Sequence, residues 1–312
     1  MTNLDPHERP PDGIRAVYKK YQKMKSYQLA LDPDIVDLPG QSLPNRDPKI
    51  RVVKELDPGS LQCTNIKTCQ VGLHIIPSLL PSEIQLILLS RLLHRDLSHP
   101  SHLTNIHNHY NVSYPPGNSS FFTLPPNSPD IVAHPIDPSI HRPVTTLQLL
   151  NKKMRWVTLG GQYDWTKKNY PNSPPPPFPS DIGQLLEDVF TDTKAEAAIV
   201  NLYSPGDTLS MHRDVAESSA TGLISVSLGC DAVFIIGTTS SSSSECRDDD
   251  AAIQENVVAL RLRSGSAVYM SGPSRFAWHG VPQIIPGTCP EALRTRSQMN
   301  MRPGEAGWRG RG

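Results

Sequence analysis

The chain has 312 residues, enough for one catalytic domain with an extension and for a substantial hydrophobic core. Lysine plus arginine and aspartate plus glutamate balance at 30 residues each. This balance excludes a global field that would draw the protein onto nucleic acid or a membrane, so any basic contact surface must be local. The 31 prolines and an aromatic content of only 6% indicate many turns around a modest sheet core, and they favour a mainly β fold over a helical bundle.

The cysteines and the N-terminus indicate an intracellular protein. The five cysteines are scattered and form no CxxC pair, which is typical of reduced thiols and argues against a zinc site. The N-terminal stretch MTNLDPHERPPDG has no apolar signal segment, and no later segment is long enough to span a bilayer. We therefore expect the cytoplasm or the nucleus, with the mitochondrion also open. We expect no membrane partner, and nothing indicates an obligate protein partner.

An N-terminal extension is predicted for residues 1–70. Apolar residues from Ile14 to Met24 recur at helical spacing while lysine and arginine fill the other face, which predicts a helix over 14–25 that docks on the main domain. The basic face of this helix offers contacts for phosphate, but a solvated face is the favoured interpretation. Residues 28–70 are rich in proline and aspartate and predict an extended arm.

The catalytic domain is predicted for residues 71–302, followed by a basic Gly/Arg tail at 303–312. It opens with a strand in GLHIIPSLL and a helix that begins at Pro81-Ser82 and runs through EIQLILLSRLL. The helix ends in a His-x-Asp sequence, His94-Arg95-Asp96, followed by further histidines, for which a solvated loop is favoured over a metal site. Residues 110–143 are predicted to form a long loop rich in proline, serine and asparagine.

Aromatic side chains mark a predicted hairpin edge in RWVTLGGQYDW. Trp156, Tyr163 and Trp165 are candidates for stacking on a base flipped out of its helix, and core packing explains them equally well. The following tract, residues 171–181, has the composition of a stiff polyproline linker and is a less favoured candidate for an SH3 or WW ligand. Ser180 then caps a predicted helix through DIGQLLEDVF, and AAIVNLY is predicted to be a strand.

The central motif is NLYSPGDTLSMHRD, residues 201–214. His212 and Asp214 lie two residues apart on an extended run, so both side chains point to one face and can bind one metal ion. They would supply two of the three ligands of a 2-His-1-carboxylate site, the arrangement that holds non-heme Fe(II) with open positions for oxygen and a co-substrate. His279, at the start of a later strand and 65 residues after Asp214, is the candidate for the third ligand.

Many short β segments follow Asp214, separated by turn residues, with a polar loop insertion at 238–252. This spacing is typical of a jelly roll. The predicted fold is therefore mainly β with flanking helices (α+β), with a double-stranded β-helix (jelly-roll) core and an N-terminal helical extension.

Two arginines near the end of the chain predict a carboxylate-binding pocket. Arg296 and Arg302 are six residues apart, so on an extended strand they face the same way, and a guanidinium binds a carboxylate through two parallel hydrogen bonds. Asn201 and Tyr203, two residues apart, can add neutral hydrogen bonds to the same ligand. Together these four residues describe a pocket for a small dicarboxylate beside the metal.

These elements, in this order, resemble the signature of the AlkB family of Fe(II)/2-oxoglutarate dioxygenases. The elements are Asn-x-Tyr, then eight residues, His-x-Asp, a distal histidine and Arg-x5-Arg. The local sequences RWVTLGGQYDW and MSGPSRFAWHGVP are similar to those of the branch named for the first eukaryotic AlkB homologue. The resemblance implies iron held by His212, Asp214 and His279. It also implies 2-oxoglutarate bound by Asn201, Tyr203 and Arg296, with Arg302 near the other end of that ligand.

The chemistry implied by this resemblance uses O2 and 2-oxoglutarate to oxidise an N-methyl group on a base. The methyl carbon leaves as formaldehyde, and 2-oxoglutarate becomes succinate and carbon dioxide. At position 216 this chain has alanine, where bacterial AlkB has an aspartate that helps to recognise the alkylated base, so the preferred base stays open.

The first functional hypothesis is an enzyme that demethylates bases in nucleic acid. RNA is favoured over DNA, and N6-methyladenine and N1-methyladenine are the leading marks. A base that is already single-stranded costs least to flip, which favours loops as substrates. Local basic groups would follow the phosphate backbone; the candidates are Lys152, Lys153, Arg155, Lys167, Lys168, Arg275, Arg309 and Arg311. The alternatives are a hydroxylase or demethylase of a histone or ribosomal protein, and a non-catalytic nucleic-acid-binding scaffold.

Overall fold

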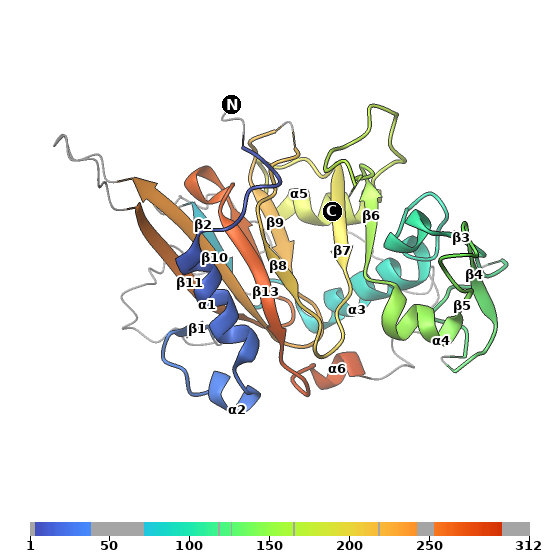
Figure 1. Cartoon of the computed structure of the whole chain (residues 1–312), viewed down its shortest axis with the longest axis horizontal. Helices are drawn as coiled ribbons and strands as arrows, with labels where there is room; N and C mark the ends of the chain where they lie inside the picture. The colour runs from blue at the N-terminus through green and yellow to red at the C-terminus, as the bar shows by residue number, and fades with distance from the viewer. Residues whose placement is uncertain are drawn as a thin grey trace, which may run out of the picture. The chain divides into compact units, whose positions relative to one another are not determined.

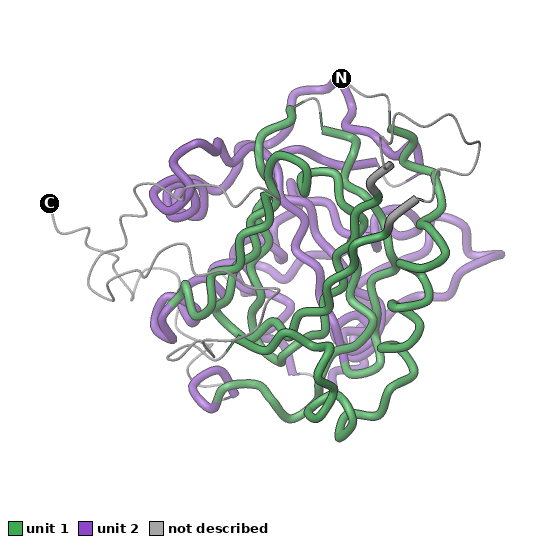
Figure 2. The backbone as a smooth tube through the Cα atoms, turned by 90° about the vertical axis from the view of Figure 1, so that its left-hand side faces the viewer, with its two compact units in different colours: residues 1–55, 65–80, 205–290 green, residues 56–64, 81–204, 291–312 purple. Residues whose placement is uncertain are grey.

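The structure is a computed structural model, and it describes residues 4–38, 72–117, 119–125, 127–164, 166–217, 219–241 and 253–294. The described residues divide between two compact units (Figure 2). Unit 1 takes those within 1–55, 65–80 and 205–290, and unit 2 takes those within 56–64, 81–204 and 291–312.

Unit 1 contains two β-sheets. The larger has the strand order β1-β11-β10-β13-β8, and the smaller has the order β2-β12-β9. The bounds are β1 (Ile35–Asp37), β2 (Leu73–Ile76), β8 (Leu209–His212), β9 (Leu223–Val226), β10 (Ala232–Ser241), β11 (Ile253–Leu262), β12 (Ala267–Met270) and β13 (Trp278–Ile284). From β8 to β13 the chain crosses to the smaller sheet for β9 and again for β12, and β10, β11 and β13 lie in the larger sheet with β8, which is how a jelly roll is wound. Figure 1 shows the strands of the larger sheet side by side. The predicted fold class is therefore confirmed.

The middle strand of the larger sheet is buried on both faces. Val233 and Ile235 of β10 belong to an apolar cluster with the N-terminal helix, while Phe234 and Ile236 point to the opposite face and are also buried. A strand covered on both sides is a continuous apolar run rather than an alternating one, as the sequence AVFIIG shows.

The N-terminal helix α1 (Asp12–Lys23) covers one face of the larger sheet beside β10, β11 and β13 (Figure 1). It buries Ile14, Tyr18 and Tyr21, so the predicted docked helix is confirmed. Its other face is exposed and basic, and Lys20 on that face forms 3.0 Å ion pairs with Asp32 and Asp34. A short helix, α2 (Ser26–Leu29), follows.

Two predictions about unit 1 need correction. Within the predicted arm, β1 pairs in parallel with β11 through Ile35↔Ala259, so this part of the arm is a sheet strand. In the predicted loop insertion 238–252, residues up to Ser241 continue β10, because their backbone pairs with β11 as far as Ser241↔Ile253. Residues 39–71, 242–252 and 295–312 lie outside the described residues, and with them most of the arm, most of the insertion and the tail.

Unit 2 contains two smaller sheets with short helices. One has the order β3-β4-β5, and the other pairs β6 with β7. The bounds are α3 (Ser82–Ser90), η1 (Arg91–Asp96), η2 (Asn105–Asn108), β3 (Tyr110–Val112), β4 (Ile131–Pro135), β5 (Val144–Thr145), α4 (Thr146–Gln148), η3 (Leu149–Lys153), β6 (Trp156–Gly160), α5 (Ser180–Val189), β7 (Ala197–Asn201) and α6 (Glu291–Arg294). In the part of the chain that the structure describes, no helix has the length and apolar character needed to cross a membrane.

The prediction of a loop over residues 110–143 was wrong in part, because this segment supplies β3 and β4. Tyr110, Val132 and Ala133 are buried there, but each strand has at most five residues, too few to stand out among the prolines and serines around them. The helices predicted to begin near Ser82 and at Ser180 are confirmed as α3 and α5. The predicted cap was wrong, because Ser180 is the first residue of α5 and Pro179 holds the N-cap position without a side-chain hydrogen bond.

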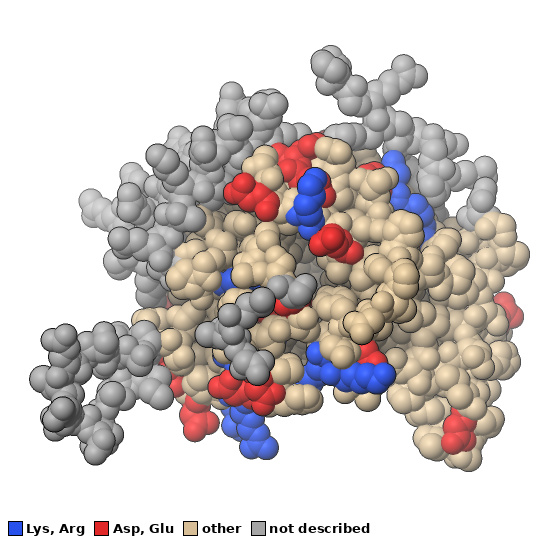
Figure 3. Space-filling model, turned by 90° about the horizontal axis from the view of Figure 1, so that it is seen from above, with Lys and Arg blue, Asp and Glu red and all other residues tan. Residues whose placement is uncertain are grey.

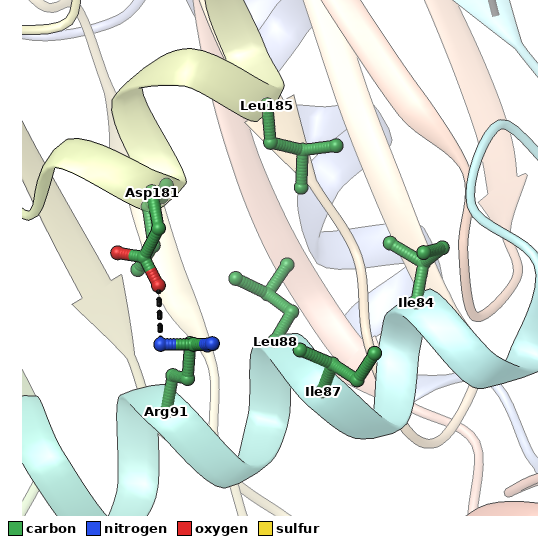
Figure 4. A pocket seen from close by; sticks show the side chains of 7 residues that line it. Ile84, Ile87, Leu88, Arg91, Asp181 and Leu185 are labelled. Atoms are coloured by element: carbon green, nitrogen blue, oxygen red, sulfur yellow. Dashed lines mark ion pairs between the residues drawn. The ribbon is translucent and has the colours of Figure 1, made fainter. Parts of the chain in front are cut away.

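An apolar groove lies between α3 and α5 (Figure 4). Ile84, Ile87 and Leu88 of α3 line it together with Leu185 of α5, and the 2.8 Å ion pair between Arg91 and Asp181 lies beside them. Isoleucine and leucine at a spacing of three and four residues put the apolar side chains of α3 on one face, which explains this packing.

The His-x-Asp sequence at residues 94–96 lies in η1, and its side chains bind neighbouring residues. His94 shares a 2.7 Å hydrogen bond with the hydroxyl of Ser120, and Arg95 pairs with both Asp96 and Asp181. Asp96 is 2% exposed. The predicted solvated loop was therefore wrong at this point, because ion pairs and packing bury the segment.

A candidate metal centre

Strand pairing brings two histidines together in unit 1. His279 of β13 lies opposite His212 of β8 in the register of the larger sheet, so both imidazoles stand on the same face with ring centroids 4.4 Å apart. Asp214 lies two residues beyond His212. Its Oδ1 is 3.6 Å from Nε2 of His212 and its Oδ2 is 3.3 Å from Nε2 of His279.

These three side chains form a group able to hold a metal ion. One donor atom from each can be chosen so that all lie within 4.8 Å of one another. Two atoms bound to one ion at about 2.1 Å are at most about 4.2 Å apart, so only a slight contraction would bring all three into bonding distance. Among the described residues this is the one group of three or more such side chains close enough to share an ion.

The backbone sets which nitrogen of each ring is free. Nδ1 of His212 is 2.9 Å from the carbonyl oxygen of Ser210, and Nδ1 of His279 is 3.1 Å from that of Ala277. A carbonyl oxygen only accepts hydrogen bonds, so each Nδ1 carries the proton and donates it. Nε2 of each ring is therefore the nitrogen that faces Asp214, and it can bind a metal ion once it carries no proton. Such a hydrogen bond at the far nitrogen is typical of histidines that bind metals.

The charges around the carboxylate keep it ionised. Burial alone would raise the pKa of Asp214, but the hydrogen bond and charge of His279, with the charges of His212 and Arg275, lower that pKa to about 2. Burial and the charge of His279 lower the pKa of His212, which favours its neutral form. Burial also works against charging His279, but the hydrogen bond to Asp214 raises its pKa. An ionised carboxylate and a neutral imidazole are the forms that ligate metals.

Residues that alternate with these side chains face the other side of the sheet. Met211 and Trp278 are buried in the apolar cluster that includes Ile14 of α1. Between the first two candidate ligands, Arg213 lies over the Trp278 ring, 4.5 Å from its centroid, and forms an ion pair with Glu8. The N-terminal segment therefore supports the back of the strands that carry the candidate ligands. Sequence reasoning missed this role, although the alternation of a strand already placed Arg213 opposite His212.

Arg275 was predicted to contact phosphate, and the structure argues against that role. The residue is 3% exposed. Its guanidinium donates to the carbonyl oxygens of Asp214 and Thr221, both at 2.8 Å, and to the carboxylate of Glu217 at 3.1 Å. A basic residue next to a turn gave no signal of burial, because exposure depends on what packs around it.

The remaining predicted site residues lie in unit 2 or outside the described residues. Asn201 ends β7, where it pairs with Trp156 of β6, and Tyr203 follows two residues later. The ring of Tyr163 packs edge-on against Tyr170 with centroids 5.3 Å apart. Trp165, Arg296 and Arg302 lie outside the described residues. The roles of all these residues in binding co-substrate or substrate stay predictions.

Comparison with known proteins identifies the family. Residues 126–302, more than half of the chain, match the model of the 2OG-Fe(II) oxygenase superfamily. A protein of Pyricularia oryzae named "N6-methyladenosine RNA demethylase ALKB1" is 42% identical over 94% of this chain and 90% of its own length. The chain belongs to the AlkB family of 2OG-Fe(II) oxygenases. The resemblance predicted from the sequence motifs is thereby confirmed.

Two further relatives of this AlkB-family dioxygenase come from a yeast and from human. The "tRNA demethylase abh1" of Schizosaccharomyces pombe is 42% identical over 72% of each chain. The human "Nucleic acid dioxygenase ALKBH1" is 38% identical over 46% of this chain and 36% of the human protein.

The cofactors of the superfamily are Fe(II), 2-oxoglutarate and O2. Two imidazole nitrogens and one carboxylate are the donor set that suits Fe(II) in such enzymes, so the chemistry of the group formed by His212, Asp214 and His279 fits the metal of the family.

Proposed function

We propose that this AlkB-family dioxygenase removes methyl groups from nitrogen atoms of nucleic-acid bases, with RNA as the favoured substrate. The observation that carries the proposal is the convergence of two imidazole Nε2 atoms and one carboxylate at the paired ends of β8 and β13. In an oxygenase family, this donor set is where an iron-dependent oxidation would take place.

In this proposal each residue has a distinct task. His212, Asp214 and His279 hold Fe(II), and Arg296 binds a carboxylate of 2-oxoglutarate with Asn201 and Tyr203 as neutral partners and Arg302 beside them. With 2-oxoglutarate, the bound metal supplies the O2-dependent conversion of a methyl C–H bond to C–OH, which releases succinate and carbon dioxide. The hydroxymethyl group then leaves the base nitrogen as formaldehyde.

Two features of the protein keep the metal ligands in the required state. The carbonyl oxygens of Ser210 and Ala277 hold the two imidazole rings with Nε2 turned toward Asp214. The low pKa of Asp214, about 2, keeps its carboxylate ionised throughout the physiological range. His212 and Asp214 are therefore in the forms that ligate a metal, whereas binding at His279 displaces the proton that its bond to Asp214 favours.

The names of the relatives support a nucleic-acid substrate. The Pyricularia oryzae and Cryphonectria parasitica relatives are named as N6-methyladenosine RNA demethylases, and the Schizosaccharomyces pombe relative as a tRNA demethylase. We therefore place N6-methyladenine in RNA first and N1-methyladenine second. The cytoplasm and the nucleus, with the mitochondrion open, stay our predicted compartments.

We expect substrate contacts to be local rather than driven by a global field. On the face shown in Figure 3, the described acidic and basic side chains are interspersed, without a large patch of one sign. Exposed lysines such as Lys152, Lys153 and Lys167 would contact the phosphates. Trp156, Tyr163 and Trp165 would stack on the flipped base.

One assay tests this proposal against its alternatives. The purified chain is given Fe(II), ascorbate, O2 and 2-oxoglutarate with RNA, transfer RNA and DNA oligonucleotides that carry N6-methyladenine or N1-methyladenine, and formaldehyde and succinate are measured. Unmethylated oligonucleotides and the His212→Ala variant are the controls. Formaldehyde from methylated RNA only, and none from the variant, is the expected result.

The other outcomes would overturn the proposal. Turnover on histone or ribosomal peptides without turnover on any oligonucleotide would indicate a protein hydroxylase or demethylase. Binding of nucleic acid that is unchanged in His212→Ala, with no turnover by the unaltered chain, would indicate a scaffold.

A further inference from the structure

The three candidate metal ligands are not held in the same way. His212 and His279 lie in paired strands, and a backbone carbonyl fixes each ring. Asp214 lies two residues past the end of β8, in a segment from 213 to 222 whose described residues, 213–217 and 219–222, form no helix or strand. Strand pairing cannot set the direction of its carboxylate, so another contact must hold the main chain at this point.

Arg275 makes that contact. Its Nη1 donates to the main-chain oxygen of Asp214 at 2.8 Å, its Nε donates to that of Thr221 at 2.8 Å, and its Nη2 pairs with the carboxylate of Glu217 at 3.1 Å. All three acceptors belong to the segment 213–222. The guanidinium therefore ties the beginning, middle and end of this segment to a single point.

The far end of the segment is fixed independently by close packing. At Gly222, an added Cβ would come within 2.3 Å of the Tyr269 ring, so the backbone there lies directly against an aromatic side chain of β12. With its end held against the sheet and its beginning held by Arg275, the segment has little freedom to turn the carboxylate of Asp214.

Burial makes the arrangement stringent. Arg275 is 3% exposed, and a buried guanidinium without acceptors would strongly destabilise the fold. The residue also lies four positions before His279, directly after the turn Gly272–Ser274. Arg275 therefore links the segment that leads into His279 to the segment that follows Asp214.

We infer that Arg275 is a positioning residue for the metal centre, which aims the carboxylate of Asp214 by gripping the main chain of the segment 213–222. It touches neither substrate nor metal. The inference rests on the proposed role of Asp214 as a metal ligand. Lysine cannot replace it, because one ammonium group does not reach three acceptors spread over eight residues, whereas the planar guanidinium does.

The test measures metal binding by the full chain rather than turnover. The chain is stripped of metal with a chelator and titrated with Co²⁺, which reports its ligand geometry through its visible absorption, while calorimetry gives the dissociation constant. The variants are Arg275→Gln, Arg275→Lys and the milder Glu217→Gln. The matched control is Arg261→Gln, because Arg261 is also partly buried in an ion pair, 2.7 Å from Asp231 in the same unit, and contacts none of the three candidate ligands.

We expect Arg275→Gln and Arg275→Lys to weaken Co²⁺ binding by about 10- to 100-fold and to alter the absorption spectrum, the usual effect of losing a group that orients a ligand. Glu217→Gln should have a smaller effect in the same direction. Arg261→Gln should lower the melting temperature without changing the affinity for Co²⁺.

Each remaining outcome separates this inference from the proposed function. Unaltered Co²⁺ affinity in the Arg275 variants, when the parent chain binds Co²⁺, would overturn the inference and leave the proposed function standing. If the parent chain binds no Co²⁺, the proposed metal centre itself is wrong. Should both Arg275 variants fail to fold, unchanged affinity and spectrum in Glu217→Gln would refute the inference, and the expected partial loss would support it.

Discussion

Replacing Ile14 by alanine should loosen the N-terminal helix from the larger sheet. Ile14 is fully buried, and its Cδ1 would lie 2.9 Å from a Cβ added at Gly237 of β10. Gly237 pairs with Trp278, the residue before His279, so the contact lies directly behind the candidate metal centre. We expect Ile14→Ala to lower the free energy of unfolding by about 2–5 kcal/mol, because it removes buried methylene groups and leaves a cavity.

The converse change tests the same contact from the other side. Gly237→Ala inserts a methyl group where Ile14 leaves no room, and overpacking of this kind costs about 1–3 kcal/mol. In the double variant the new methyl group fills part of the space that Ile14 vacated. The loss should therefore be smaller than the sum of the two single losses by about 0.5–3 kcal/mol.

Urea denaturation followed by circular dichroism would measure the four proteins of this cycle. A coupling free energy within about 0.5 kcal/mol of zero would contradict the docking of α1 on β10, since residues that do not touch give additive losses. Leu31→Ala is the matched control for Ile14→Ala, because it also truncates a large apolar side chain, but one that is 80% exposed. We expect it to change the free energy of unfolding little.

Three further predictions concern the metal, the co-substrate and pH. Asp214→Asn should abolish Co²⁺ binding seen by calorimetry, since it removes the anionic donor; retained binding would refute its role as a ligand. Arg296→Ala should raise the KM for 2-oxoglutarate about 10- to 100-fold, from the 1.5–3 kcal/mol of a charge-assisted hydrogen bond, while an unchanged KM would place the carboxylate elsewhere. Burial lowers the pKa of His102, so its contribution to stability is present above about pH 6.5 and is lost as the pH falls below that value. His102→Gln should flatten the dependence of unfolding on pH between 7 and 5, and an unaltered slope would contradict this.

Short-range patterns in the sequence predicted much of the candidate site. His212 and Asp214 share a face because successive side chains of an extended chain alternate, and this holds whatever the rest of the protein does. The docked helix α1 was predictable for a similar reason, since Ile14, Tyr18 and Tyr21 recur at the period of a helix. The ordered spacing of the motifs also led to the correct family.

Patterns of this kind failed where packing decides between two states of the same residue. A sequence of prolines and serines concealed β3 and β4, whose few buried residues are recognisable only beside their pairing strands. The exposure of Arg275 could not be predicted either, because a basic side chain is solvated or buried according to the acceptors that surround it.

The sequence by itself predicted which residues would carry the chemistry and determined which of them share a local face. Tertiary structure decided which residues distant in the sequence come into contact. The register of β13 against β8 sets His279 beside His212, and the buried guanidinium of Arg275 holds the segment that carries Asp214. The physical reason is range. Backbone geometry acts over a few residues, whereas pairing and burial join segments 60 or more positions apart, as His279 and His212 are, and depend on the whole core.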